Sequence, residues 1–344
     1  MKQTRYFVIF ALFILFGGTA NAQQDAQFSQ YMFNSLYYNP GFAGVDGQTR
    51  FTGIHRTQWL NYEPTNFSGG APQSTIISGS TLFPKQKIGV GGFMMYDRLG
   101  PITNINLSVS LSKHVKIGTG MLGLGVSGGF MNQRLHTGDY IVVNPEDEVY
   151  QQLVNSGGLS QFNPDLSAGI WYHHKKYYFG ASFNHLIRPN IDFSLDGVNS
   201  RMSNHMYITG GYNFQVLPSL VVTPSALLQS DINTWTYLFG FNATFQEKIY
   251  AGLHVRQSIG ERRGGASEGL GWSNDDIILM VGINLLKNAQ GMDALRLGYA
   301  FDFVTSGVDA KKRTSHEIML TYMIPNPFGQ PNPPVRTPRY RHGD

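Results

Sequence analysis

The feature that most constrains this chain is a two-residue alternation of apolar with small or polar side chains, which recurs from about residue 48 to residue 324. It is clearest in residues 294–304, where leucine and aromatic residues take every second position and Arg296, Gly298 and Asp302 fall between them. Adjacent residues of a β-strand point to opposite faces of the sheet, so the alternation predicts strands with one apolar face. Soluble β-sandwiches alternate in the same way, and the pattern alone does not separate the two architectures.

The lengths of the segments and of their connections favour a barrel in a lipid bilayer. Most of the predicted strands run for about ten residues or more, which suits a tilted transmembrane strand, whereas soluble strands average about five or six. Connections are mostly long after odd-numbered strands, such as 136–164, and short after even-numbered ones, such as 217–219. Bacterial outer-membrane barrels sort their connections in this way, and closure removes the strand edges that lipid cannot satisfy.

The sequence therefore predicts an all-β fold: a transmembrane outer-membrane antiparallel β-barrel of about fourteen strands. A short plug-like segment precedes it, and a Pro-rich C-terminal tail follows it. The tail holds six prolines, which prevent sheet pairing and favour an extended chain. Its arginines suit an acidic partner surface, and a solvated end without a partner is the alternative.

Residues 1–22 have the form of a secretory signal peptide. Lys2 and Arg5 precede an apolar run at 6–16, and small residues at Ala20 and Ala22 precede the predicted cleavage site. A membrane anchor is the alternative, but it requires about 20 apolar residues. We expect the protein to lie in the outer membrane of a Gram-negative bacterium. Because an even number of strands returns the chain to its starting side, we expect both termini to be periplasmic.

These patterns divide the chain into four parts. They are the signal peptide at 1–22, an N-terminal periplasmic or plug segment at 23–47, the outer-membrane β-barrel at 48–324 and the periplasmic tail at 325–344.

Composition and motifs argue against an enzyme or a metal site. The chain has no cysteine, which removes thiolate ligands and cysteine nucleophiles, and its dispersed net charge of +4 does not indicate nucleic-acid binding. Residues 123–128 match a glycine-rich nucleotide motif, but they continue a strand alternation instead of the strand-to-helix turn that the motif requires. His173 and His174 are adjacent and point to opposite faces. We expect no catalytic residue, cofactor, bound metal or small-molecule substrate; a hydrolase that gathers residues from several strands is the alternative.

Aromatic residues gather near the ends of the predicted strands, among them Trp59, Trp171, Tyr177 and Tyr178. We expect them to form girdles at the membrane interfaces. The alternative is the ordinary preference of aromatic residues for strands.

The stretch 27–44, QFSQYMFNSLYYNPGFAG, lies between the signal peptide and the first predicted strand. Its first half is rich in amide and aromatic side chains, and Asn39-Pro40-Gly41 signals a turn. In these residues the chain resembles the opening of the PorP/SprF family of type IX secretion system membrane proteins. The resemblance extends over essentially the whole mature chain, through Arg56, Gln58-Trp59, Gly89, Asp97, Asn163-Pro164-Asp165, His185-Leu186, Leu295-Arg296, Asp302 and the run at 315–320.

The resemblance implies an outer-membrane barrel that works with the type IX secretion machinery. Members of the family assist the export or surface anchoring of cargo such as gliding adhesins, so the implied partners are a periplasmic ring or a secreted surface adhesin, besides outer-membrane lipid. The family has no catalytic residues to carry over. A passive outer-membrane diffusion channel is the alternative function.

We expect the stretch 27–44 to pack into or beneath the barrel lumen and to couple it to a partner; a plug with only a stabilising role is the alternative. The candidate partner-binding residues are Gln27, Phe28, Ser29, Gln30, Tyr31, Asn39, Pro40 and Gly44 before the barrel, and Arg336, Arg339 and Tyr340 in the tail.

Overall fold

A computed structural model describes residues 25–63, 70–136, 159–191, 201–231, 234–262, 269–287, 293–305 and 313–329, together with residues 139, 146 and 151. For residues 260–262, 269–275, 287 and 293 it describes the backbone only. Among the described residues, no helix is both long enough and apolar enough to cross a membrane.

Three short helical turns precede a series of antiparallel strands. The turns are η1 (Tyr31–Phe33), α2 (Ser35–Tyr38) and η2 (Pro40–Phe42). The strands are β1 (Thr49–Thr57), β2 (Gln73–Phe83), β3 (Ile88–Leu99), β4 (Ile102–Ile117), β5 (Gly120–Leu135), β6 (Leu159–His173), β7 (Tyr177–Asn184), β8 (His205–Tyr212), β9 (Phe214–Leu217), β10 (Leu220–Ser230), β11 (Trp235–Phe245), β12 (Ile249–Arg262), β13 (Gly269–Lys287), β14 (Asp293–Val304) and β15 (Ser315–Ile324).

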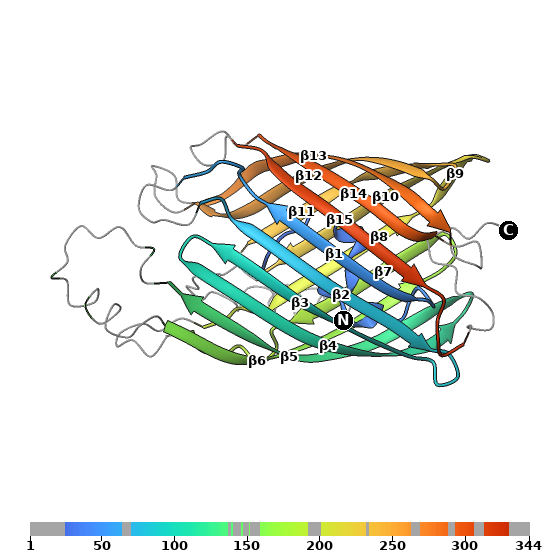
Figure 1. Ribbon diagram of the computed structural model, residues 1–344, viewed down its shortest axis with the longest axis horizontal. Coiled ribbons are helices and arrows are strands. Elements are labelled where there is room, and N and C mark those ends of the chain that lie inside the picture. The colour runs from blue at the N-terminus through green and yellow to red at the C-terminus, as the bar shows by residue number, and fades with distance from the viewer. Residues whose placement is uncertain are drawn as a thin grey trace, which may run out of the picture.

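The sheet closes on itself because β1 pairs with both β2 and β15. Strands β8 and β9 pair with the same neighbour, β10, and are separated only by Asn213, so together they occupy one position in the ring. The closed sheet therefore has fourteen strand positions, and the prediction of an all-β antiparallel barrel of about fourteen strands is confirmed. Figure 1 shows that the strands are tilted relative to the long axis of the barrel.

The two ends of the barrel differ in their connections. At one end, here called the short-turn end, the chain turns at 84–87, 118–119, 174–176, 218–219 and 246–248. The opposite end, the long-connection end, carries longer segments such as 58–72 and 185–204, although β3 and β4 are joined there by Gly100 and Pro101 alone. In Figure 1 the short-turn end lies at the right.

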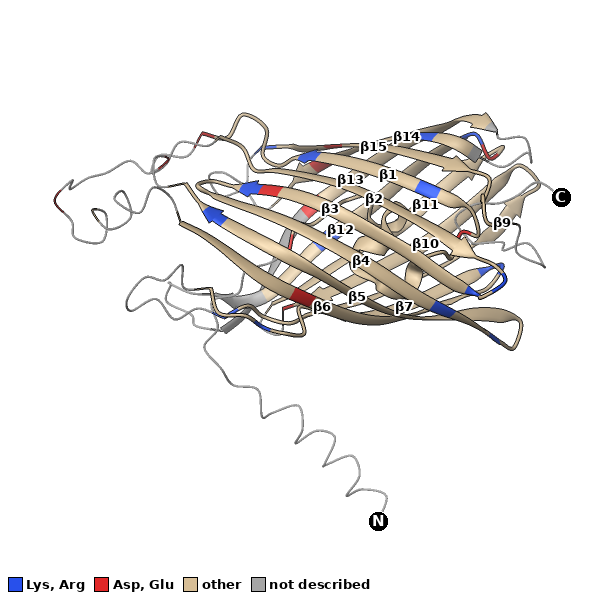
Figure 2. Ribbon diagram, turned by 60° about the horizontal axis from the view of Figure 1, so that its bottom comes forward, with Lys and Arg blue, Asp and Glu red and all other residues tan. Residues whose placement is uncertain are grey.

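Apolar side chains cover the outside of the barrel, and small or polar side chains face inward. On β4, Leu107, Val109 and Leu111 are each more than half exposed, whereas the intervening Ser108 and Ser110 are buried. Charged residues are sparse along the strands (Figure 2). An apolar outer band with a polar interior is the arrangement that a barrel in lipid requires.

The structure differs from the sequence-based expectations in two respects. Strand β6 begins at Leu159 instead of residue 165, and the pairing of β12 with β13 continues to Arg262 and Gly269. Several strands are therefore longer than the alternation indicated. Trp171 and Tyr178 do not belong to an interfacial girdle, because both are almost fully buried inside the barrel. Their rings stack 5.3 Å apart beneath η2.

Candidate functional site in the barrel lumen

The segment 25–48 lies inside the barrel, where it forms the three helical turns η1, α2 and η2. From Phe28 to Asp46 every residue is buried. Six of its buried residues join inward-facing side chains of the strands in one apolar cluster: Phe28, Tyr31, Met32, Phe33, Tyr37 and Tyr38. We call residues 25–48 the lumenal segment.

The lumenal segment extends through the lumen to the short-turn end. Its first described residue, Asp25, contacts His185, which follows the long-connection end of β7. Its last turn reaches the short-turn end, where the Asn326 side chain donates to the Gly47 carbonyl at 3.1 Å. The chain therefore enters β1 at the short-turn end after threading the lumen from the opposite half.

Asn39 fixes the segment against β6 and β7. Its Oδ1 accepts from the Gly41 amide at 2.8 Å, which caps η2, and its Nδ2 donates to the carbonyls of Ile170 and Ala181 at 2.9 and 3.1 Å. One side chain thus closes a turn and spans two strands of the wall. This geometry accounts for the turn signal that the sequence carries at Asn39-Pro40.

Inward-facing glycines make room for this turn. A Cβ on Gly125 would lie 2.2 Å from the Gly41 nitrogen, and one on Gly123 would lie 2.3 Å from the Gly41 carbonyl oxygen. The glycine-rich run at 123–128 is thus a strand surface against which η2 packs, as its alternation indicated. Gly44 has φ +74°, a backbone conformation that favours glycine. A Cβ on Gly44 would lie 2.6 Å from the Gly89 Cα atom, so there is no space for a side chain.

A network of buried charges holds the other half of the segment. Arg56 lies 2.7 Å from Asp302 and 3.5 Å from Glu317, and Arg256 contacts Asp302 at 3.3 Å and also pairs with Asp276. Both arginines, Asp302 and Glu317 are at most 4% exposed. Because unpaired buried charges are costly, each group depends on its partners.

Ser29 and Gln30 complete this network. The Ser29 hydroxyl donates to Asp302 at 2.7 Å and accepts from Arg56 at 2.7 Å and Arg256 at 3.0 Å. The backbone amides of Ser29 and Gln30 donate to the two Glu317 carboxylate oxygens at 2.7 and 2.8 Å. The lumenal segment therefore supplies three donors that balance the excess of carboxylates over guanidinium groups.

The network also lies across the seam of the barrel. Arg56 on β1 is the cross-strand partner of Glu317 on β15, the pair of strands that closes the sheet. Residues 29–30 thus contact both edges of the closing pair from inside.

A second polar cluster surrounds Asp25. His185 donates from one ring nitrogen to Asp165 and from the other to Asp25, both at about 3.0 Å, and the Tyr207 hydroxyl donates to Asp25 at 2.6 Å. Burial lowers the pKa of His185, but the charge of Asp25 and the hydrogen bonds to Asp165 and Asp25 outweigh it and raise the pKa to about 10. Burial alone would raise the pKa of Asp25, but His185 and His205 hold it well below its ordinary value. His185 has φ +59°, an uncommon conformation for a non-glycine residue, and its carbonyl accepts from Asn204 at 2.7 Å.

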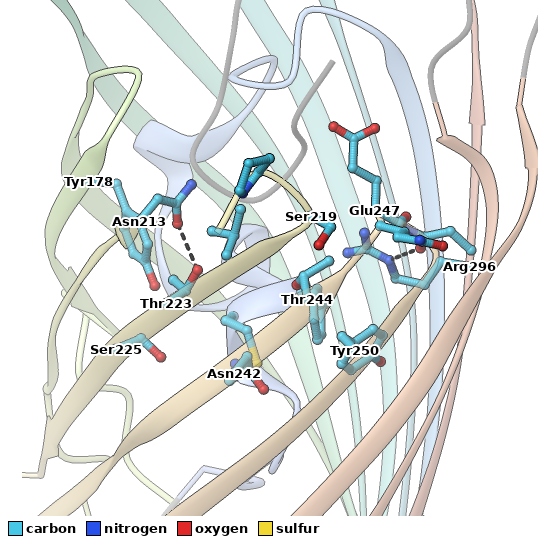
Figure 3. Close-up of a pocket in the computed structure, with 16 residues that line it drawn as sticks. Tyr178, Asn213, Ser219, Thr223, Ser225, Asn242, Thr244, Glu247, Tyr250 and Arg296 are labelled. Atoms are coloured by element: carbon cyan, nitrogen blue, oxygen red, sulfur yellow. Dashed lines mark hydrogen bonds between the residues drawn. The ribbon is translucent and has the colours of Figure 1, made fainter. Parts of the chain in front are cut away.

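A hollow opens beside the segment at the short-turn end (Figure 3). Met32 and Phe33 form its inner wall, and Ser219 and Glu247 belong to the turns at its rim. Its empty space, solvent at the mouth included, is about 870 Å³. The Arg296 guanidinium lies 4.9 Å from the Phe33 ring centre and donates to Asn284 at 2.6 Å, which fixes a positive charge in the wall.

The candidate partner-binding residues lie in different environments. Phe28, Ser29, Gln30, Tyr31, Asn39, Pro40 and Gly44 are all buried in the lumen, and Gln27 is half-buried beside Phe28. The Tyr31 hydroxyl donates to Ser225 of β10 at 2.9 Å. Arg336, Arg339 and Tyr340 lie outside the described residues. The charge network and the Asp25 cluster were not expected from the sequence; the only signal was the occurrence of Arg296 and Asp302 between the apolar positions of residues 294–304.

Comparison with known proteins identifies one family. The model of the family described as "Type IX secretion system membrane protein PorP/SprF" matches residues 20–322. No match was found among curated proteins.

Similar solved structures are outer-membrane proteins of low sequence identity. The Ralstonia pickettii toluene transporter TbuX has a TM-score of 0.46 at 11% identity and covers 85% of this chain and 93% of its own. A Pseudomonas aeruginosa FadL homologue has a TM-score of 0.43 at 13% identity, with 80% and 89% covered. Acinetobacter baumannii Omp33 has a TM-score of 0.41 at 8% identity, with 82% and 100% covered.

Proposed function

Because the chain belongs to the PorP/SprF family of type IX secretion system membrane proteins, we propose that it assists the export or surface anchoring of cargo, such as gliding adhesins, through protein–protein contacts. Family and fold together make it an outer-membrane component of that system. Its proposed partners are a periplasmic ring of the machinery or a secreted surface adhesin, and its proposed role is non-enzymatic.

The observation that carries this proposal is the filled lumen. The lumenal segment is held by Asn39 on one wall and by Ser29 and Gln30 on the other, so it bridges the interior instead of lining it. A diffusion channel needs a continuous aqueous path, and a segment with an apolar cluster and desolvated charges opposes one. A passive channel remains the second candidate, and the hollow at the short-turn end is the observation that favours it.

In this proposal the chain keeps its four-part division. Residues 1–22 are removed, 23–47 serve as the plug, 48–324 form the barrel and 325–344 extend into the periplasm. The short-turn end faces the periplasm, as in bacterial barrels generally. Both termini are then on the periplasmic side, and from Asp25 onward the lumenal segment fills the lumen.

The candidate residues act in two ways under this proposal. Arg336, Arg339 and Tyr340 contact an acidic partner surface directly. Phe28, Tyr31 and Asn39 are buried, so a partner reaches them only when the lumenal segment leaves its site, and coupling operates through that displacement.

Deletion of the gene combined with bilayer recordings tests the proposal. We expect loss of surface display of a specific adhesin with unchanged outer-membrane permeability, and restoration by the wild-type chain. An unchanged set of secreted and surface proteins would contradict the proposal. Large, steady currents through the purified barrel, with normal export in the deletion strain, would instead establish the diffusion channel.

Alanine substitutions separate coupling from simple plugging. Phe28→Ala, Tyr31→Ala and Asn39→Ala that lose export but keep the normal heat-modifiable migration of the barrel support coupling. Loss of the folded barrel in the same variants supports a plug that only stabilises.

A further inference from the structure

Three metal-ligating side chains from distant parts of the chain meet inside the barrel. They are Asp25 of the lumenal segment, His185 directly after β7, and His205, the first residue of β8. Their donor atoms all lie within 4.8 Å of one another. The two histidines flank the connection between β7 and β8, so the sheet itself sets their spacing.

The separations are close to those of a coordination sphere. The Nε2 atom of His185 lies 3.0 Å from the Asp25 Oδ2 atom, and the Nδ1 atom of His205 lies 4.0 Å from the same oxygen. Imidazole nitrogens and carboxylate oxygens bind zinc at about 2.0–2.2 Å, which places neighbouring ligands of a tetrahedral site about 3.5 Å apart. Small side-chain rotations therefore suffice to centre an ion between these three groups.

The surrounding groups orient the ligands as they do in known metal sites. The Nδ1 atom of His185 lies 3.0 Å from Asp165, so a neutral His185 would donate there and leave Nε2 free to ligate. Metal-binding histidines almost always donate their second ring N–H to a carboxylate, a backbone carbonyl or a water molecule, and Asp165 is a partner of the first kind. The Tyr207 hydroxyl, 2.6 Å from Asp25, holds that carboxylate in turn.

His205 provides an independent indication of a missing ligand. It is 1% exposed, and neither of its ring nitrogens has a hydrogen-bond partner of normal geometry among the described residues. Buried polar groups are almost always satisfied, so a buried imidazole that lacks a hydrogen bond of normal geometry and lies beside a carboxylate requires an explanation. An ion bound between His205 and Asp25 supplies one.

We propose that Asp25, His185 and His205 bind a divalent transition-metal ion of the zinc class. Two imidazoles and one carboxylate suit zinc, and a water molecule fills the fourth position. With both histidines neutral, the two positive charges of the ion balance the carboxylates of Asp25 and Asp165. The ion fastens the start of the lumenal segment to the barrel wall, in addition to the anchor that Asn39 provides.

The competing arrangement is an ion pair in which a proton on His185 takes the place of the metal. The two differ in what they require of His205. The ion pair needs only Asp25, His185 and Asp165, whereas the metal site needs His205 as a ligand. A variant of His205 therefore separates them without disturbing the hydrogen bonds of His185.

The test is zinc binding by the purified, chelator-stripped barrel in detergent, measured by equilibrium dialysis against Zn²⁺ and metal analysis. We expect one tightly bound equivalent in the wild type. Asp165→Asn should weaken binding by about 10–100-fold, as loss of a group that orients a ligand does, and His205→Gln should weaken it at least as much. Folding of each variant is checked by heat-modifiable migration.

His173→Gln is the matched control. His173 is also buried, and neither of its ring nitrogens has a partner among the described residues, but it lies on β6 with His114 as its ring neighbour. This variant should bind zinc as the wild type does. Absence of tight zinc in the wild type, or equal binding by wild type and His205→Gln, would overturn the proposal. Equal weakening by His173→Gln and His205→Gln would also overturn it.

Discussion

Gly125→Ala should loosen the lumenal segment without opening the barrel. The new methyl group would point into the lumen, 2.2 Å from the Gly41 nitrogen and 2.3 Å from the Pro40 carbonyl carbon. Ordinary contacts between such atoms are about 3.5–4.0 Å, so η2 must move by about 1 Å or more. Because both clashing atoms belong to the backbone, no side-chain rotation relieves the overlap.

The size of the effect follows from the cost of overpacking. Inserting a methylene group into a close-packed interior costs about 1–3 kcal/mol. Since every 1.4 kcal/mol is a factor of ten, the fraction of molecules with a displaced segment should rise by about 5- to 150-fold. The strand ladder of β5 keeps its hydrogen bonds, because the substitution leaves the backbone donors and acceptors in place.

The chain has no cysteine, so one reporter thiol measures this displacement. Ser35 on α2 is 2% exposed, and Ser35→Cys labelled with a maleimide under conditions of rapid opening reports the open fraction. The control is Gly128→Ala on the same strand, where the nearest atom to a new Cβ is the Leu166 side chain at 3.6 Å. Equal labelling rates in the two backgrounds would refute the packing argument, as would loss of the folded barrel in Gly125→Ala alone.

Three further substitutions, two of them with a matched control, test other parts of the structure. Asp302→Ala should lower the free energy of unfolding in lipid vesicles by about 3–5 kcal/mol, because two buried arginines lose a partner. The control Asp139→Ala breaks a partly exposed ion pair with Arg98 and should lower it by less than about 1 kcal/mol. Asn39→Asp keeps the acceptor that caps η2 but loses both donors to the wall, so the same labelling assay should report a cost of about 1–3 kcal/mol; an unchanged rate contradicts the anchoring role. Val126→Arg, in mid-strand on the lipid face, should cost about 2–4 kcal/mol, and Ile117→Arg at a strand end about 0–1 kcal/mol; equal costs would argue against the membrane depth of β5.

The barrel could be predicted because its determinants are local in sequence. The alternation of Leu107, Val109 and Leu111 with serines is a property of neighbouring residues, and the structure places the first set outside and the second inside. Strand ends were less certain, because β6 continues through Pro164 and β12 through Gly260, residues that usually mark the end of a strand.

The polar sites could not be predicted in the same way, because their members are brought together only by closure. Ser29 and Asp302 are 273 residues apart, and Asp25 and His185 are 160 apart, so no spacing along the chain pairs them. The prediction that Trp171 and Tyr178 belong to a membrane girdle was wrong for a related reason. Trp171 and Tyr178 sit near a short turn, where a membrane girdle is expected, but the lumenal segment provides an interior surface for them to cover.

The contacts at the barrel seam have a consequence for how the protein is made. The amides of Ser29 and Gln30, close to the start of the described chain, bind Glu317 on β15, 288 and 287 residues away. Contacts of this separation form late, because the intervening chain must be ordered first. The lumenal segment leads into β1 from inside the barrel, and the remaining strands surround it. It can therefore enter its site most easily before the barrel closes. On this account the pairing of β15 with β1 is also the step that seals the occupant inside, and an empty closed barrel would be a misassembled product instead of a precursor.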